Sequence, residues 1–531
     1  MLGLELVVIL GAAVLLCHLA GQRLRIAPHV LLLVAGVLLG LVPALRQVHL
    51  PPETVLLLFL PALLYWESLT TSLRELRRDL RGVVLMSTVL VIVTAGAVAA
   101  AVHALGMPWG PAWVLGAAVA PTDATAVGVV ARLLPRRALT LLRAESLIND
   151  GTALVVYSLA VGITLGDEHF SLPHVGGQFL LSYGAGALAG VVIAWLGAWV
   201  RRRLDDPLLE NVAIVLIPFS AFLLAEAVHA SGVLAVVVCG LIMSQAGPRV
   251  GNAHARQQTQ AFWSLATFLL NGALFVLVGL ESQSAFRGLT GTDRTDALIA
   301  VGVVCAVLVV VRLVFQFTAV YLIRLIDRRP QQRLRRMSHR ARVAGALSGF
   351  RGAVSLALAL AVPEVLGSGA AFPGREMIIF VTSGVILVTL VVQALVLPGV
   401  LRWARLPHDT GVERERHLAE TLATEDALTA LPHVSAELGT DQEVTDRLRD
   451  EFEERLRVLR ARAPEADGMV DEPALRHDQH YAALRLALLA RKRATVTRLR
   501  DENRIDDTVL RQIQTRLDIE EVRLSHRETV E

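Results

Sequence analysis

The segment Arg143-Ala-Glu-Ser-Leu-Ile-Asn-Asp-Gly151 places two carboxylates inside a long apolar stretch. On a helix, residues four positions apart share a face, so Ser146 lies beside Asp150 and Glu145 beside Asn149. Ionisable side chains in the middle of a membrane span are costly, and by default they indicate a functional site. A patch of hydrogen bonds between helices is the ordinary alternative, but two carboxylates in little more than one turn exceed what such a patch needs.

The composition as a whole is that of a membrane protein. The chain has 531 residues, 54% of them hydrophobic, and a mean hydropathy of +0.54, which is too apolar for a soluble protein of this size. A helix needs about 20 apolar residues to cross a bilayer, and about thirteen such stretches can be found between residues 2 and 403. Two of them, 209–229 and 231–246, are separated only by a short turn, so a count of about twelve is the alternative. The first stretch has no basic residue before it, which favours a retained helix over a cleaved signal peptide.

The charged residues outside these stretches predict the orientation and the domains. Alternate loops are basic, for example Arg201–Arg203 and the cluster Arg324–Arg342. By the positive-inside rule, the N-terminus then lies outside and the C-terminus in the cytoplasm of a plasma-membrane protein. We therefore predict an all-α polytopic transmembrane domain over residues 1–405. Residues 406–531 are rich in Glu, Arg, Asp and Leu at helical spacing and predict a helical cytoplasmic tail, either a solvated appendage or a regulatory or dimer-contacting domain.

Two other spans are interrupted by polar residues. The segment Ala120-Pro-Thr-Asp-Ala-Thr125 combines Pro121, which removes a backbone donor, with the carboxylate of Asp123. The segment Ser348-Gly-Phe-Arg-Gly-Ala353 places Arg351 between two glycines. Non-helical backbone at membrane depth survives only where it lines a cavity or faces protein, and paired interruptions indicate a transporter site near the midplane. A simple kink is the alternative for Pro121 alone.

Other buried charges need partners. An unpaired guanidinium is expensive inside a membrane, so Arg351 requires a counter-charge. Glu145 is the strongest candidate, and we predict a structural Arg351–Glu145 pair. Arg312 is equally well a packing or snorkelling residue, and Asn271 and Glu67 are weaker candidates for the site.

The polar residues suit a small cation and a proton. Na⁺ is a hard cation that favours oxygen ligands, as the hard divalent ions do, and Asp150, Ser146, Asp123 and backbone carbonyls of the broken span could supply them. Burial disfavours the charged form of a carboxylate, so a proton would compete with the cation for Asp150. Exchange follows if the accessible side changes only when one of the two is bound. We expect no cofactor besides the transported Na⁺ and H⁺. We also expect no enzyme activity and no nucleic-acid partner, since no nucleophile–base set, metal cluster or phosphate loop is visible.

Three segments resemble the signatures of a known family: Pro121-Thr-Asp-Ala-Thr125, Glu145-Ser-Leu-Ile-Asn-Asp-Gly151 and Phe350-Arg-Gly-Ala-Val354. They are similar to those of bacterial sodium/proton exchangers of the monovalent cation:proton antiporter superfamily, in the Asn-Asp branch related to the animal exchangers. The similarity covers roughly residues 1–405. It implies inverted repeats with two discontinuous crossing helices, a homodimer in the lipid bilayer, and a role in pH regulation.

The resemblance also implies roles for individual residues. Asp150 would be the exchanging carboxylate, and Asn149, a neutral neighbour that shapes the site, would accompany electroneutral exchange. The residues that would help coordinate Na⁺ are Thr122, Asp123 and Ser146. Glu145 would pair with Arg351.

Alternatives remain at this stage. K⁺ or Li⁺ could replace or accompany Na⁺, because cavity size and ligand geometry decide the selectivity. A cation channel would conduct without proton coupling. A membrane receptor would need a signalling domain after residue 408, and no such domain is visible in the sequence.

Overall fold

The computed structural model describes residues 2–24, 28–43, 52–71, 73–123, 136–166, 172–247, 253–289, 291–326, 338–349, 351–366, 369–405, 411–461, 472–502 and 504–528. Thr125, Phe350 and most of the basic loop Arg324–Arg342 lie outside these ranges. Within them, the regular structure is helical apart from one isolated bridge between Val365 and Ala371. The chain divides into two units, Met1–Pro407 and His408–Glu531.

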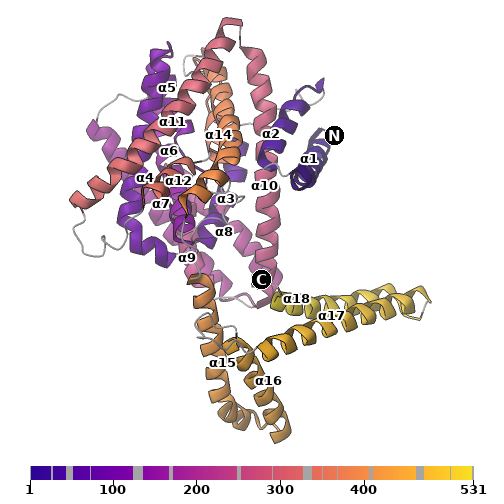
Figure 1. Ribbon diagram of the computed structural model, residues 1–531. Helices are drawn as coiled ribbons and strands as arrows, with labels where there is room; N and C mark the ends of the chain where they lie inside the picture. The colour runs from indigo at the N-terminus through magenta and orange to yellow at the C-terminus, as the bar shows by residue number, and fades with distance from the viewer. Residues whose placement is uncertain are drawn as a thin grey trace. The chain divides into compact units, whose positions relative to one another are not determined.

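The first unit is a helical bundle (Figure 1) in which every predicted span contains helix. Its helices are α1 (Leu2–Leu24), α2 (Pro28–Leu39), α3 (Pro52–Thr70), α4 (Leu73–Ala104), α5 (Trp109–Val119), α6 (Arg136–Leu165), α7 (Leu172–Arg201), α8 (Pro207–Ala227), α9 (Gly232–Ala246), α10 (Ala253–Gly288), α11 (Gly291–Ile326), α12 (His339–Leu347), α13 (Ala353–Leu360) and α14 (Arg375–Ala404). Eight helices of the described ranges are long and apolar enough to cross a membrane. The all-α, polytopic prediction is confirmed.

Both predicted interruptions are present. Helix α5 ends at Val119, immediately before Ala120 and Pro121. The predicted span that contains the segment Ser348–Ala353 consists of two short helices, α12 and α13, separated by Ser348–Gly352. Proline and glycine therefore end these helices where the sequence predicted.

Helices α8 and α9 are separate helices joined by a short turn. Helix α9 begins after Ser231, whose hydroxyl accepts a hydrogen bond from the Leu234 amide at 3.2 Å, which is a standard N-cap. Between the two helices His229 adopts a positive φ of 52°. The chain therefore turns here instead of continuing as one long helix.

Small residues allow close approach of the helices that carry the interrupted segments. A methyl group at Gly116 of α5 would lie 2.3 Å from the carbonyl oxygen of Ala95 in α4. A methyl group at Gly36 of α2 would likewise lie 2.0 Å from the carbonyl oxygen of Val276 in α10. Close backbone contact of this kind supplies the van der Waals packing that holds membrane helices together. Helices α4, α5 and α6 form one packed group in this way, around the second buried core of the unit.

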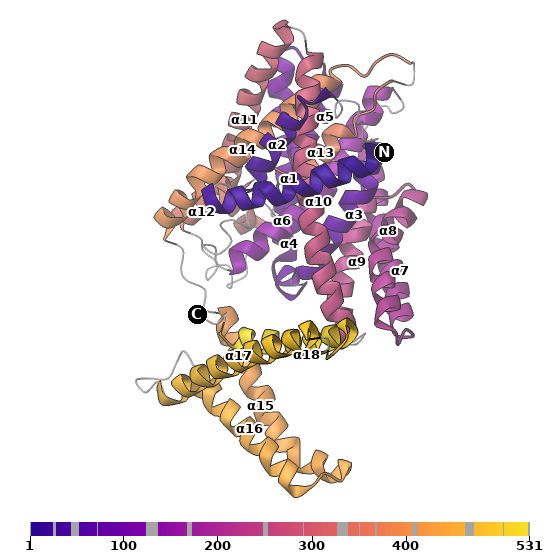
Figure 2. The ribbon, with the colours of Figure 1, turned by 90° about the vertical axis from the view of Figure 1, so that its right-hand side faces the viewer.

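The second unit consists of two antiparallel helical hairpins (Figure 2). Helices α15 (Gly411–Leu438) and α16 (Gln442–Ala461) form the first, and α17 (Glu472–Asp501) and α18 (Asp507–Glu528) form the second. Leu489, Leu517 and Leu524 are the buried core of the second hairpin. Asp506 accepts the amide of Thr508 at 2.8 Å, and this bond holds the pKa of the Asp506 carboxyl below its usual value. This capping contribution is therefore present at neutral pH and is lost only in acid.

Candidate functional site

The two interruptions meet at Arg351. Its Nε donates to the carbonyl of Val119 at 3.1 Å, and its Nη1 donates to the carbonyl of Gly349 at 2.6 Å. Val119 is the last residue of α5, and Gly349 lies just beyond the end of α12. A cation is favoured at helix C-termini, where carbonyl groups lack intrahelical partners. Arg351 thus satisfies the ends of two broken helices at once, and its side chain is only 3% exposed.

Asp123 lies at the opposite kind of helix end. A methyl group at Gly352 would lie 1.7 Å from Oδ2 of Asp123, so this carboxylate packs directly against the Gly352 backbone. Gly352 is the N-cap of α13 and supplies no side-chain cap. A negative charge is favourable at a helix N-terminus. The interrupted segments therefore place a cation at two C-termini and an anion at one N-terminus.

Asn149 joins three parts of this region. With its amide oriented so that both ends are satisfied, its nitrogen donates to the carbonyl of Glu145 at 3.1 Å and to that of Ser87 at 3.3 Å. Its oxygen then accepts the hydroxyl of Thr122 at 3.1 Å. Asn149 is completely buried. It therefore fixes α6 to α4 and to the polar segment that follows α5.

Asp150 is the buried carboxylate beside this network. It is 4% exposed, and Ser146, one turn earlier on α6, is 2% exposed. The carboxylates of Glu67 and Asp123 lie close enough to Asp150 to interact with it electrostatically. Glu67 belongs to α3, and among the described residues its buried Oε1 has no hydrogen-bond partner. Helices α3 and α6 and the segment after α5 thus bring carboxylates toward one region, which sequence spacing could not establish.

The predicted Arg351–Glu145 pair is wrong. Glu145 instead lies 2.7 Å from Arg312, measured from Oε1 to Nη2. The contact is an ion pair without hydrogen-bond alignment. The Arg312 guanidinium also packs against Gly349, and its Nε approaches the carbonyl of Gly345 at 3.5 Å. Arg351 donates to main-chain carbonyls instead.

Sequence reasoning missed two contributors and included one outlier. Gln393 of α14 donates to the carbonyl of Gly349 at 3.2 Å, and an amide within an apolar helix was a signal that could have found it. Ser87 contributes a backbone carbonyl, for which no sequence signal exists. Asn271 is half-buried in α10 and makes no hydrogen bond to another described residue. Thr125 lies outside the described ranges.

The close contact between Gly352 and Asp123 leads to a testable prediction. Gly352→Ala should lower the exchange rate about tenfold or more, because overpacking of this kind costs about 1–3 kcal/mol and Asp123 must move to relieve it. The measurement is cation-driven proton movement in liposomes. Gly302→Ala is the matched control, since a methyl group there meets nothing within 4 Å. Equal rates for the two variants would contradict the packing.

Two interrupted helices that meet at compensating charges, beside buried carboxylates, define a secondary transporter. Residues 9–403 match the profile of a family described as the transmembrane sodium/hydrogen exchanger. The chain belongs to this family.

Related proteins carry the same family name, and a solved structure has the same fold. An uncharacterised Na⁺/H⁺ exchanger of Mycobacterium tuberculosis is 45% identical over 98% of this chain and 96% of its own length. The Na⁺/H⁺ antiporter ApNhaP of Aphanothece halophytica is 33% identical over 78% of this chain and 76% of its own. The sodium proton antiporter MjNhaP1 of Methanocaldococcus jannaschii has the same fold, with a TM-score of 0.57 at 19% identity, over 76% of this chain and 99% of that protein.

Proposed function

We propose that this protein exchanges Na⁺ for H⁺ across the plasma membrane and that Asp150 holds the two ions in turn. Na⁺/H⁺ antiport is the activity of its family and of its named relatives. The observation that carries the assignment of Asp150 is its burial beside the meeting point of the two interruptions. Buried ionisable groups in membrane helices mark ion pathways by default.

The surrounding oxygens supply the rest of the proposed site. Ser146 lies one turn from Asp150. Thr122 donates a hydrogen bond to Asn149, which directly precedes Asp150 in the chain. With Asp123, these groups offer the hydroxyl and carboxylate oxygens that a hard cation requires. The ion need not be held permanently, since a transported ion must also leave. A site assembled from separate helices suits this requirement, because small shifts between the helices change its ligand geometry.

Competition between the cation and the proton for Asp150 then produces the exchange. A buried carboxylate is costly when it is charged and unpartnered, so Asp150 takes up either a proton or a cation. In both loaded states its charge is neutralised, and the protein can change the side to which the site opens. The empty, charged state cannot change sides at a comparable rate. One ion therefore moves in only when the other has moved out.

The proposed exchange is electroneutral. Asn149 carries no charge, and its amide is used as a donor to two carbonyls. Asp123 packs against Gly352 at the N-terminus of α13, where a negative charge is favourable. We propose that Asp150 alone exchanges its proton for the cation in each cycle. A homodimer in the membrane, with the N-terminus outside, the tail in the cytoplasm and a role in pH regulation, completes the proposal.

Reconstituted protein tests the activity. In liposomes that carry a pH dye and a membrane-potential dye, Na⁺ addition should move protons without creating a potential. K⁺ and Li⁺, added in turn, establish the selectivity, which matters because a Bacillus subtilis relative, 28% identical over 74% of this chain, is named a sodium, potassium, lithium and rubidium/H⁺ antiporter. A potential that follows the Na⁺ gradient without proton movement would instead indicate a channel and overturn the proposal.

A further inference from the structure

Helix α17 presents an exposed face that its hairpin partner does not cover. Its inner face, with Ala482 and Leu489, is buried against α18. On the outer face Tyr481, Leu484 and Leu488 are 46%, 63% and 52% exposed. These residues are three and four positions apart, so they form one line along the helix. For a solvent-exposed hairpin, this line of large apolar side chains is unexpected.

Basic side chains continue the same line. Arg491 and Lys492 follow Leu488 at helical spacing, and both are exposed. Neither has an ion-pair partner among the described residues. We name the five residues Tyr481, Leu484, Leu488, Arg491 and Lys492 the α17 stripe. It extends over roughly 17 Å, at a rise of about 1.5 Å per residue.

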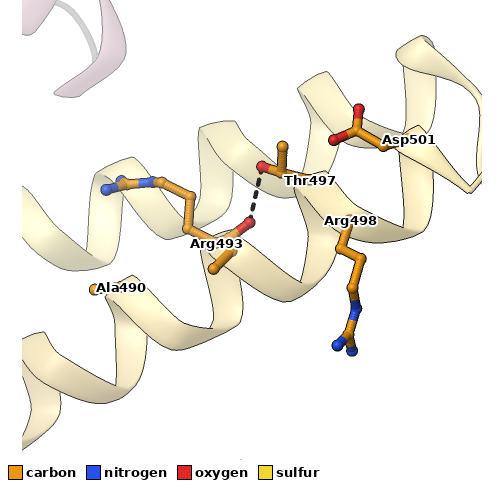
Figure 3. A pocket seen from close by; sticks show the side chains of 6 residues that line it. Ala490, Arg493, Thr497, Arg498 and Asp501 are labelled. Atoms are coloured by element: carbon orange, nitrogen blue, oxygen red, sulfur yellow. Dashed lines mark hydrogen bonds between the residues drawn. The ribbon is translucent and has the colours of Figure 1, made fainter.

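The other basic residues of α17 are already engaged. Arg493 contacts Asp518 and Glu521 of α18, each at 2.5 Å, and Arg485 contacts Glu520 at 3.2 Å. Figure 3 shows an open groove on another face of α17, where Arg493 and Arg498 point in different directions. Arg491 and Lys492, which have no such partner, therefore add uncompensated positive charge to the exposed apolar line of α17. The helix as a whole has seven Arg and Lys residues against three Asp and Glu residues.

We propose that the α17 stripe binds the anionic lipid headgroups of the membrane surface. Interfacial helices combine large apolar side chains with basic residues, and each Lys or Arg beside an acidic lipid surface is attracted to it. A second copy docked on the same stripe would bring like charges together, whereas an anionic surface complements them. The inference goes beyond the proposed exchange and rests only on the tail's attachment to a membrane protein.

A short segment of chain joins the tail to the last membrane helix. Only residues 405–410 separate α14 from α15. Helix α16 then runs back along α15, since His417 Nε2 lies 2.5 Å from the carbonyl oxygen of Leu459. The segment leading to α17 therefore starts near the end of α15 that is joined to the last span. A tether of this kind turns lipid binding into a local event at high effective concentration.

Full-length protein in liposomes tests the proposal. A fluorophore on Thr495→Cys, on the exposed side of α17, is placed in a background where Cys17, Cys239 and Cys305 are replaced by Ala. Quenching by spin-labelled lipids should appear in vesicles that contain phosphatidylglycerol, should be weak in phosphatidylcholine alone, and should fall at high salt. Both leaflets contain the acidic lipid, so the orientation of the protein does not affect the result.

Charge variants provide the control. Arg491→Gln with Lys492→Gln should lower the bound-to-free ratio on the order of 30-fold, because each basic residue near an anionic surface is worth about 1 kcal/mol. The matched pair Arg511→Gln with Arg516→Gln, on the exposed side of α18, should leave the quenching nearly unchanged. Quenching that ignores lipid charge, or that both pairs reduce equally, overturns the proposal. So does disulfide cross-linking of two copies through Leu488→Cys, which would identify a second copy as the occupant.

Discussion

Asp150→Asn should abolish Na⁺-driven proton movement while leaving the fold intact. Asparagine has the shape of aspartate and keeps one oxygen, so the buried packing around this 4% exposed side chain is preserved. It cannot take up a proton or supply a negative charge to a cation. Both halves of the exchange therefore fail together. The measurement is the rate of proton movement in liposomes after Na⁺ addition, which should fall to that of protein-free vesicles.

The control for this variant is a similar substitution at an exposed carboxylate. Asp296→Asn, near the start of α11, makes the same chemical change at an exposed side chain. It should exchange ions at the native rate. Size-exclusion profiles and melting temperatures of the two variants should match that of the native protein. Retained Na⁺-dependent exchange by Asp150→Asn would show that another group carries the ions.

The neighbouring Asn149 has a structural role, which differs from that of Asp150. Its amide nitrogen donates to the carbonyls of Glu145 and Ser87, and an ionised carboxylate in its place would face both oxygens without a proton. Leaving buried groups unsatisfied costs about 1–3 kcal/mol each, and more where charge is involved. Asn149 thus has a structural reason to be neutral, independent of stoichiometry. The family resemblance implied a neutral neighbour that shapes the site, without these hydrogen-bond partners.

Much of the fold could be predicted from the sequence because its signals are local. Each apolar run is long enough to specify helix. Helices end just before Pro121 and Gly349, and α13 begins after Gly352, through the backbone chemistry of proline and glycine. The turn at His229 is also a local feature, because Ser231, two residues later, caps the start of α9. The candidate site residues on α6 were predictable for the same reason, since helical spacing alone places Ser146 beside Asp150.

The choice of charge partners was not predictable, because it depends on main-chain groups. Arg351 is satisfied by the carbonyls of Val119 and Gly349, which any residue at those positions would present. Sequence reasoning considers side chains, and so it assigned Arg351 the carboxylate of Glu145. That carboxylate was left for Arg312. The same limit hid the Ser87 carbonyl that holds Asn149.

Removing one partner of the Glu145–Arg312 pair should destabilise the protein strongly. Breaking a buried ion pair by deleting one member costs about 3–5 kcal/mol, because the other charge is left uncompensated. Arg312→Met and Glu145→Gln should each lower the melting temperature in lipid nanodiscs. The double variant should be more stable than the sum of the two losses predicts, since neither charge then remains unpaired. The coupling should be on the order of 1–3 kcal/mol, as for residues in direct contact.

A second cycle, with Glu145→Gln and Arg351→Met, distinguishes the two possible partners. Arg351→Met should also be destabilising, because it removes donors from the ends of α5 and α12, but its effect should add nearly independently to that of Glu145→Gln. The buried pair Arg201–Glu210, at 2.7 Å between Nη2 and Oε1, calibrates the coupling of an ion pair between α7 and α8. Stronger coupling of Glu145 to Arg351 than to Arg312 would restore the pairing that the sequence suggested. The opposite order would assign Arg351 to the helix ends and Arg312 to the carboxylate, so that separate cations stabilise the interrupted backbone and the charge on α6.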